Sequence, residues 1–168
     1  SYAFTENDDT LFVHLYIGSD VKKKVNGQEV AVHIDSAFPW DGKVTVSVDG
    51  ANVPLTLALR ITGWANSYTV SADSSEYTIK DGYLYITRTW KKGETLTLDF
   101  PMEIQVWNAD PRVREDIGKA AVTRGPITYC LEEKDNGTDL HMLTLAWNAP
   151  AFVKDSVVAG AHVKANVM

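Results

Sequence analysis

Residues 55–61, LTLALRI, carry large apolar side chains at every second position. Successive side chains of a β-strand point to opposite faces, so a period of two predicts a strand with one face in a core. Gly63, a residue that favours turns, follows this run and marks where the strand ends.

The same period of two recurs on both sides of residues 55–61. Asp49-Gly50 and Asp81-Gly82 are turn dipeptides that separate neighbouring runs. Large apolar residues alternate in this way at residues 11–17, 30–34, 44–48, 68–71, 77–79, 83–89 and 95–100. Eight short strands spaced about ten residues apart are typical of an antiparallel sandwich or barrel. The predicted fold class is therefore all-β, an antiparallel β-sandwich of the jelly-roll or Ig-like kind.

A second group of elements follows the first eight strands. One short helix is expected at residues 111–118, where Asp110 is placed to cap the first turn and Pro111 takes the first helical position. Further strands are predicted at residues 102–107, 120–123, 127–131, 142–145 and 162–167.

This change of pattern predicts two domains. We place the boundary within residues 105–112, with a complete β-sandwich accessory domain over residues 1–108 and part of a second, C-terminal β-sandwich over residues 109–168. The first has about a hundred residues, which is enough for a core of its own. The second has about sixty residues and is marginal on its own.

Composition places the chain among ordinary soluble globular proteins. Of its 168 residues, 45% are hydrophobic and 23% are charged, which excludes disordered, collagen-like and coiled-coil chains. No apolar run approaches the roughly 20 residues that span a bilayer, so we expect no membrane partner. The net charge of -6 disfavours nucleic acid as a partner. The lysines at residues 22–24 are expected at a solvated hairpin tip before Asn26-Gly27.

The sequence contains no familiar arrangement of catalytic or metal-binding side chains. The single cysteine, Cys130, excludes an internal disulfide and a zinc site made of several thiolates. Its apolar surroundings predict a packing role. The acids lie mostly in turns, where their carboxylates bond nearby amides. Calcium at Asp8-Asp9 or at residues 135–139 is a weaker hypothesis, because neither stretch has the alternating acids and terminal Glu of an EF-hand.

The tryptophans are the strongest sign of a binding function. Exposed indole faces on a β surface stack on sugar rings, and the candidates for such a site are Trp40, Trp64 and Trp90. Turn residues adjoin Trp40 and Trp64, and rings in such places often close the end of a sandwich core. We favour the core or a domain interface and keep sugar binding as the alternative. The remaining tryptophans are Trp107 and Trp147.

Several stretches occur in the same order as in a known family. They are LFVHLYIGS at residues 11–19, FPWDG at 38–42, LALRITGW at 57–64 and GYLYI at 82–86, followed by Trp90. Together they resemble the middle β-sandwich of glycoside hydrolase family 127, and FPM at residues 100–102 looks like the close of that module. GKAAVTRGPITYCLE at residues 118–132 is similar to the start of the family's C-terminal sandwich.

The resemblance implies a parent protein with β-L-arabinofuranosidase activity on plant-type glycans. In this family an (α/α)6 barrel upstream of the sandwiches carries the chemistry. A cysteine nucleophile acts there on a zinc ion held by a glutamate and further cysteines. No position of this chain matches those residues, and Cys130 belongs to the C-terminal sandwich. The resemblance therefore implies no catalytic residue, metal or cofactor in this chain, with zinc in the missing barrel.

We therefore expect a fragment of a longer protein. Its role is non-catalytic: it packs against the barrel, fixes domain orientation and helps to shape the entrance to the sugar site. The alternatives are a carbohydrate-binding module and an Ig-like interaction domain that assembles through unpaired strand edges. The family habit of degrading external glycans implies a periplasmic or extracellular parent, and the lack of disulfides also permits the cytoplasm.

Overall fold

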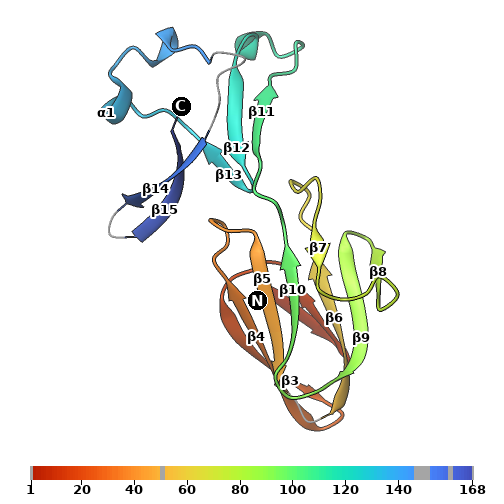
Figure 1. Cartoon of the computed structure of the whole chain (residues 1–168). Helices are drawn as coiled ribbons and strands as arrows, with labels where there is room; N and C mark the ends of the chain where they lie inside the picture. Colours follow the sequence, from red (N-terminus) through yellow and green to blue (C-terminus); the bar gives the residue numbers. More distant parts are fainter. Residues whose placement is uncertain (1, 50–51, 146–151, 159–160, 168) are drawn as a thin grey trace. The chain divides into compact units, whose positions relative to one another are not determined.

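The computed structural model describes residues 2–49, 52–145, 152–158 and 161–167, and it confirms the all-β fold (Figure 1). The chain divides into two compact units, Ser1–Met102 and Glu103–Met168. This division precedes strand β11 (Ile104–Asn108), whereas the sequence placed the boundary after residue 108. The reason is strand pairing, because β11 forms an antiparallel ladder with β12 (Ala120–Arg124) of the second unit.

One layer of the first unit is a five-stranded sheet, called sheet A below, with the strand order β1-β2-β6-β9-β8. Neighbouring strands are antiparallel, apart from β2 and β6, which run parallel. The stretch that begins at residue 55 lies in β6, the central strand. The strands of sheet A are β1 (Phe4–Asn7), β2 (Thr10–Val13), β6 (Val53–Arg60), β9 (Tyr83–Trp90) and β8 (Tyr77–Lys80).

The other layer is a second five-stranded sheet, called sheet B, with the order β3-β4-β5-β10-β7. All its paired neighbours are antiparallel. Its strands are β3 (Ser19–Val25), β4 (Gln28–Ser36), β5 (Lys43–Asp49), β10 (Glu94–Asp99) and β7 (Thr69–Val70). The last of these is shorter than the strand predicted at residues 68–71.

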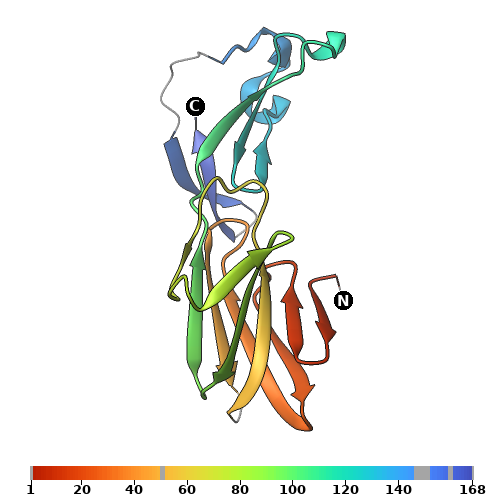
Figure 2. The same cartoon turned by 90° about the vertical axis from the view of Figure 1, so that its right-hand side faces the viewer.

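The hydrophobic core lies between sheets A and B, which face each other as a β-sandwich (Figure 2). Leu55, Leu57 and Leu59 of β6 are completely buried. Thr56, between two of them, faces outward, and its hydroxyl lies 2.8 Å from that of Thr87 on β9. Burial of each such leucine contributes roughly 1.5–3 kcal/mol. Sheet B supplies the facing side chains Val30, Val32, Ile34, Val44, Val46, Val48, Leu96 and Leu98.

Strand β2 is shorter than its sequence pattern predicts. The alternation at residues 11–17 indicates one continuous strand, but the ladder ends at Val13. Beyond that point Tyr16 still enters the core. Leu15 and Ile17 do not, and they are 44% and 55% exposed. The prediction that both belong to a buried strand is therefore wrong, because the chain leaves sheet A before it reaches them.

The lysine run does not lie at a hairpin tip as predicted. Residues 22–24 belong to β3, which pairs with β4 along its whole length. The turn itself is where the sequence places it, since Asn26 and Gly27 have φ values of 50° and 80°, as a tight hairpin requires. Lys23 points into the sandwich and is only 5% exposed, because alternate side chains of a strand face the same side.

The second unit contains a three-stranded antiparallel sheet of β11, β12 and β13 (Ile127–Tyr129). A hairpin pairs β14 (Phe152–Val158) with β15 (Ala161–Val167), and α1 (Glu133–Asn136) is a single helical turn. Of the side chains described in this unit, only Val122 and Arg124 are buried. Those residues therefore lack a core comparable to that of the first unit.

Two predicted elements of the second unit are absent or much reduced. The helix expected at residues 111–118 is a 3-10 turn at Arg114–Asp116. The strand expected at residues 142–145 is also wrong, because a 3-10 turn occupies Leu140–Met142 instead and no strand follows it before residue 146. The apolar side chains of this stretch are largely exposed, so no packed face holds it in a sheet.

Candidate functional site

Trp90 is part of the core and offers no ring face to a sugar. It is 1% exposed, and its indole Nε1 donates a hydrogen bond of 2.8 Å to the backbone oxygen of Leu55. Buried tryptophans usually satisfy their N–H in this way. The burial of Trp90 agrees with the core alternative and speaks against its use as a stacking platform.

Arg88 covers the edge of the core beside Trp90. Its guanidinium carbon lies 4.2 Å from the centre of the Trp90 ring, a cation–π contact. The same guanidinium makes ion pairs of 3.1 Å with Glu76 and 3.2 Å with Glu94. Because Arg88 belongs to β9 and Glu94 to β10, the second pair ties sheet A to sheet B.

Trp64 belongs to a cluster of rings that closes one end of the sandwich, called the end cluster below. It consists of Tyr16, Phe38, Trp64, Tyr68 and Phe100. Phe100 is central, with ring centroids 5.7 Å from Tyr16, 6.2 Å from Phe38, 6.0 Å from Trp64 and 6.4 Å from Tyr68. Four of the stretches that carry the family resemblance, LFVHLYIGS, FPWDG, LALRITGW and FPM, each contribute a ring to this cluster. Those residues therefore pack a core end.

The end cluster depends on a close backbone contact at Gly42. A Cβ placed on Gly42 would lie 1.8 Å from the backbone oxygen of Phe100. In return, the Phe100 amide donates a hydrogen bond of 3.1 Å to the Gly42 oxygen. The FPWDG stretch therefore ends in glycine because only glycine lets the chain pass so close to Phe100.

Tyr16 anchors the opposite side of the same cluster through its hydroxyl group. This group donates a hydrogen bond of 2.6 Å to the backbone oxygen of Arg60. Burial raises the pKa of Tyr16 well above its ordinary value, and the nearby Tyr83 acts in the same direction. The phenol therefore stays protonated in the folded chain and has a packing role.

Trp40 and Trp107 are the exposed tryptophans of the described residues. Trp40 is 37% exposed, and its amide donates a 2.9 Å hydrogen bond to the Ala37 oxygen in a turn. Trp107 lies on β11 of the second unit, is 56% exposed and donates from Nε1 to Thr123 Oγ1 at 2.9 Å. Trp147 lies outside the described residues. Of the three proposed sugar-binding residues, Trp40 alone is exposed and Trp64 is half-buried.

A larger aromatic surface, not identified from the sequence, lies on the outer face of sheet A. Phe12 on β2 and Tyr85 on β9 flank Ala58 of β6 in one cross-strand row. His14 comes two residues after Phe12 and Tyr83 two residues before Tyr85, and the His14 and Tyr83 rings contact each other with centroids 5.8 Å apart. Ala58 is completely buried although it points away from the core, because these rings cover it. The sequence did contain a signal for this surface, because aromatic residues occupy the outward positions of two strands whose inward positions are apolar.

These four rings, Phe12, His14, Tyr83 and Tyr85, form one connected outer aromatic group. Phe12 meets Tyr83 and Tyr85 edge to face, with centroids 5.9 and 6.1 Å apart. The His14 ring lies 6.1 Å from Phe12 and nearly parallel to it. His14 Nδ1 is 2.7 Å from Tyr83 Oη, and its Nε2 is 2.7 Å from Thr5 Oγ1. Both ring nitrogens of the histidine are thus engaged within the unit.

Residues 2–49 and 52–145 contain no group of three His, Cys, Asp or Glu side chains placed to hold a metal ion. The stretches considered for calcium, Asp8-Asp9 and residues 135–139, therefore form no such group. Cys130 is exposed and not packed as predicted, because β13 ends one residue earlier. Within the described part of the chain, no helix is both long and apolar enough to cross a membrane.

Comparison with known protein families covers both units. Residues 10–102 match the domain described as "Beta-L-arabinofuranosidase, GH127 middle domain". Residues 104–164 match the "Glycoside hydrolase family 127 C-terminal domain". The two matches meet at the division between the units, before β11.

Individual relatives agree with these matches. A non-reducing end β-L-arabinofuranosidase of Bifidobacterium longum is 35% identical over 156 residues, which is 86% of this chain and 23% of that protein. The crystal structure of a GH127 β-L-arabinofuranosidase from Geobacillus stearothermophilus T6 is 40% identical, with a TM-score of 0.82, over 92% of this chain and 25% of that one. A solved GH127 β-arabinofuranosidase is 28% identical, with a TM-score of 0.84, over 97% of this chain and 29% of that one.

The chain thus spans about a quarter of the length of the relatives that it matches. The predicted fold and the predicted family are both confirmed. The two domain matches occur in sequence order, and the solved structures agree with this one over nearly all of the chain. This chain therefore belongs to glycoside hydrolase family 127 and corresponds to its middle and C-terminal domains.

Proposed function

We propose that residues 1–168 are the non-catalytic accessory region of a family 127 glycoside hydrolase that acts on arabinofuranose-containing glycans. This proposal rests on where the side chains of the family-specific stretches lie in the structure. Tyr16, Phe38 and Trp64 of these stretches build the end cluster together with Phe100 and Gly42, and there Phe100 is completely buried and Trp64 half-buried. Residues that pack a core end in this way support a scaffold and do not line a reaction site.

The architecture suits a rigid support. Two five-stranded sheets share a single core, and the side-chain pairs Arg88–Glu94 and Lys23–Glu6 connect them near opposite edges. Such a body holds a neighbouring domain in a fixed orientation and contributes a wall beside the sugar site. The neighbour that we propose is the (α/α)6 catalytic barrel of the same polypeptide.

The proposal places the chemistry outside this chain. We assign the zinc ion and the cysteine nucleophile to the barrel, as the family resemblance implies. The described residues offer no group of three side chains placed to hold a metal ion. The exposed Cys130 has no such set of partners among them. We also propose a periplasmic or extracellular parent, where arabinofuranose-containing plant glycans are its substrates.

Hydrolysis assays of two proteins test this function. Residues 1–168 and the longer polypeptide that contains them are each incubated with zinc and a chromogenic β-L-arabinofuranoside. The longer polypeptide is expected to release the chromophore, and the chain alone is expected to match the buffer blank. Zinc-dependent release by the chain alone would overturn the proposal, and so would a longer polypeptide that is folded and zinc-loaded yet inactive.

Sugar binding is a second candidate, favoured by one observation, the exposure of Trp40. Titration with arabino-oligosaccharides and measurement of tryptophan fluorescence test it. Binding through Trp40 predicts quenching that disappears in Trp40→Ala and persists in Trp107→Ala, a matched variant at another exposed tryptophan. Unchanged fluorescence at millimolar sugar would rule this candidate out.

A further inference from the structure

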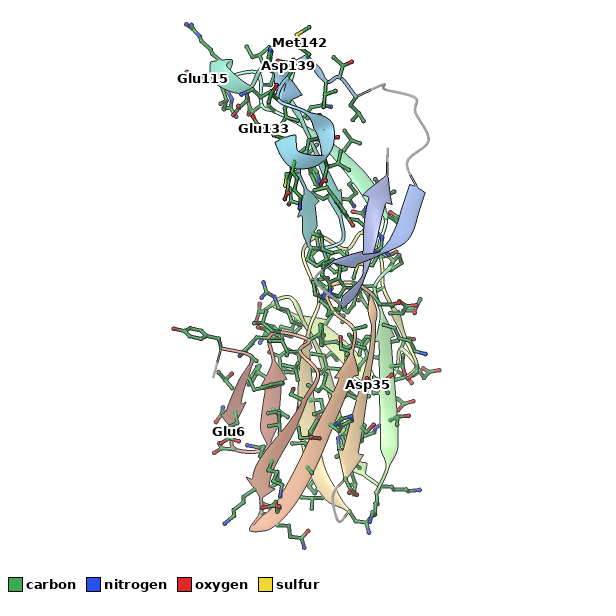
Figure 3. The ribbon with its side chains drawn as sticks, turned by 90° about the vertical axis from the view of Figure 1, so that its left-hand side faces the viewer. Glu6, Asp35, Glu115, Glu133, Asp139 and Met142 are labelled. Atoms are coloured by element: carbon green, nitrogen blue, oxygen red, sulfur yellow. The ribbon has the colours of Figure 1, made fainter. Side chains whose placement is uncertain are left out.

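The outer faces of the two sheets differ in charge. Asp35 on β4, labelled in Figure 3, belongs to a mixture of acids and bases at the outward positions of sheet B. In the five strands of sheet A, all of which are described, no outward position holds Asp or Glu. Glu6 on β1, also labelled, alternates with the outward residues and pairs with Lys23 at the edge of the core. The strands of sheet A thus give their outer face a positive charge, although the chain carries a net charge of -6.

Two exposed cations, Arg60 of β6 and Lys80 of β8, supply this positive charge. They pair with Tyr83 of β9 on its two sides in the ladders of sheet A. Two strand spacings, about 10 Å in all, therefore separate their backbones. Within residues 2–49 and 52–145 neither cation forms an ion pair, and this includes Asp81 in the turn between β8 and β9. Two long cationic side chains so placed can approach one anionic group from opposite sides.

Rings and hydroxyl groups lie beside these cations. The Tyr83 hydroxyl is held 2.7 Å from Nδ1 of His14, so Tyr83 offers a ligand its half-buried ring. Tyr85, two residues further along β9, lies opposite Thr78 of β8 in the ladder. Among the described residues, the hydroxyl groups of Tyr85 and Thr78 have no hydrogen-bond partner. Both groups can donate and accept hydrogen bonds, so this surface is prepared for a ligand that carries hydroxyl groups.

A carboxylated sugar combines the chemical groups that this surface can bind. Its carboxylate suits the two cations, and its hydroxyl groups suit those of Tyr85 and Thr78. The C–H groups of its ring suit the aromatic side chains. A neutral sugar would leave both cations unpaired, and an inorganic anion would use neither the rings nor all of the hydroxyl groups. A nucleic acid backbone is disfavoured by the net negative charge of the chain.

We infer that Arg60, Lys80, Tyr83, Tyr85 and Thr78 form a binding site for a uronate residue of a glycan, called the uronate site below. This inference rests on the proposed function, which makes a glycan the ligand that the parent protein meets. The uronate site holds an acidic part of the glycan. The accessory region thereby adds to the affinity for substrate without taking part in the chemistry.

Titration of residues 1–168 with trigalacturonate, followed by nuclear magnetic resonance, tests the uronate site. The amide signals of Thr78, Tyr83 and Tyr85 should shift and reach saturation, whereas those of Thr45 and Ser47 on the outer face of sheet B should not move. Added salt should weaken the binding, because exposed charges are screened. The absence of saturable shifts, or shifts confined to sheet B, would overturn the inference.

Matched variants separate the uronate site from a general effect of charge. Arg60→Gln and Lys80→Gln should each raise the Kd for trigalacturonate about two- to five-fold, as exposed ion pairs usually contribute. Lys43→Gln removes the same charge from the outer face of sheet B and should leave the Kd unchanged. All three side chains are exposed, so each variant should melt like the wild type. If Lys43→Gln weakens binding as much as Lys80→Gln, binding follows net charge alone and the inference is wrong.

Other ligands show which part of the uronate is recognised. The methyl ester of trigalacturonate keeps the rings and most hydroxyl groups but has no charge, and it should bind far more weakly. Acetate at the same carboxylate concentration should also bind far more weakly, because it has no hydroxyl groups. Equal binding of acetate would make the surface a simple anion site. Tighter binding of tetraglutamate than of trigalacturonate would make it a site for an acidic protein. Either result contradicts the inference.

The longer polypeptide distinguishes failure of this inference from failure of the proposed function. Calorimetry should show that it binds trigalacturonate and that Arg60→Gln lowers the affinity. If the longer polypeptide hydrolyses arabinofuranosides but Arg60→Gln leaves its affinity unchanged, the accessory function stands and the uronate site is wrong. If the longer polypeptide is folded and zinc-loaded yet inactive, the proposed function fails whatever the titration shows.

Discussion

Lys23 and Glu6 form an ion pair that joins the edge strands of the two sheets. Nζ of Lys23 lies 3.5 Å from Oε2 of Glu6, and the side chains are 4% and 62% exposed. β3 is at the edge of sheet B and β1 at the edge of sheet A. The side chain of Lys23 is therefore buried at this edge of the core, and its ammonium group meets the carboxylate of Glu6, which lies at the surface.

This geometry predicts unequal effects of removing the two partners. Glu6→Gln is expected to lower the free energy of unfolding by about 1 kcal/mol, because it leaves a buried ammonium group without a charged partner. Lys23→Met should stay closer to wild type, since an apolar side chain of similar length avoids burying a charge. Urea denaturation measures both. The exposed pair Lys22–Glu29, 3.1 Å apart, is the control, and Glu29→Gln should have little effect.

Among the glycines that the structure describes in the first unit, Gly42 is predicted to be the least replaceable. Gly42→Ala should lower the free energy of unfolding by about 3 kcal/mol, because the added methyl group collides with the Phe100 backbone and the chain must shift. Gly63→Ala is the matched control, since nothing lies within 4 Å of a Cβ at that position. Equal melting temperatures for the two variants would contradict the contact.

Removal of the buried indole is expected to damage the core severely. Trp90→Ala should cost about 3–5 kcal/mol, the usual range for deleting a large buried ring. It also leaves the Leu55 oxygen without its donor and Arg88 without its ring. Trp107→Ala, at an exposed tryptophan, should change the stability of the first unit little. Urea denaturation monitored by circular dichroism measures the free energy of unfolding of both variants.

Tyr16 makes the free energy of unfolding of the first unit depend on pH in the alkaline range. Its pKa is raised in the folded state, so the folded chain holds this proton more tightly than the unfolded chain. The contribution of Tyr16 is fully present below the ordinary pKa of 10.0 and is lost as pH rises above it. The loss is about 1.4 kcal/mol per pH unit. Tyr16→Phe should start from a lower stability, because it lacks the bond to Arg60, and should decline less above that pH. Parallel decline of the two proteins would contradict this role.

Period-two alternation was sufficient to predict much of the first unit. It located β4, β5, β6 and β9, because most of their inward side chains are apolar and each strand has partners on both sides. It failed for Leu15 and Ile17, which keep the alternation after the chain has left the sheet. It also failed for Lys23, since a charged residue at an inward edge position resembles a solvated one until its partner Glu6 is known.

The candidate surfaces depended on information that local sequence does not contain. Trp90 follows a strand pattern, but only the pairing of β6 with β9 shows that its indole reaches Leu55. Phe12 and Tyr85 are more than seventy residues apart in the chain, and they meet because β2 and β9 flank the small Ala58. The resemblance to family 127 identified the stretches that build the end cluster but not what they do there.

We propose that this chain is a scaffold without chemistry of its own. The most direct test is the initial rate of β-L-arabinofuranoside hydrolysis as a function of the concentration of residues 1–168, with zinc present. We expect the rate to stay at the buffer blank as the concentration of residues 1–168 rises, whereas the longer polypeptide should give a rate proportional to its concentration. A positive, zinc-dependent slope for residues 1–168 alone would contradict it.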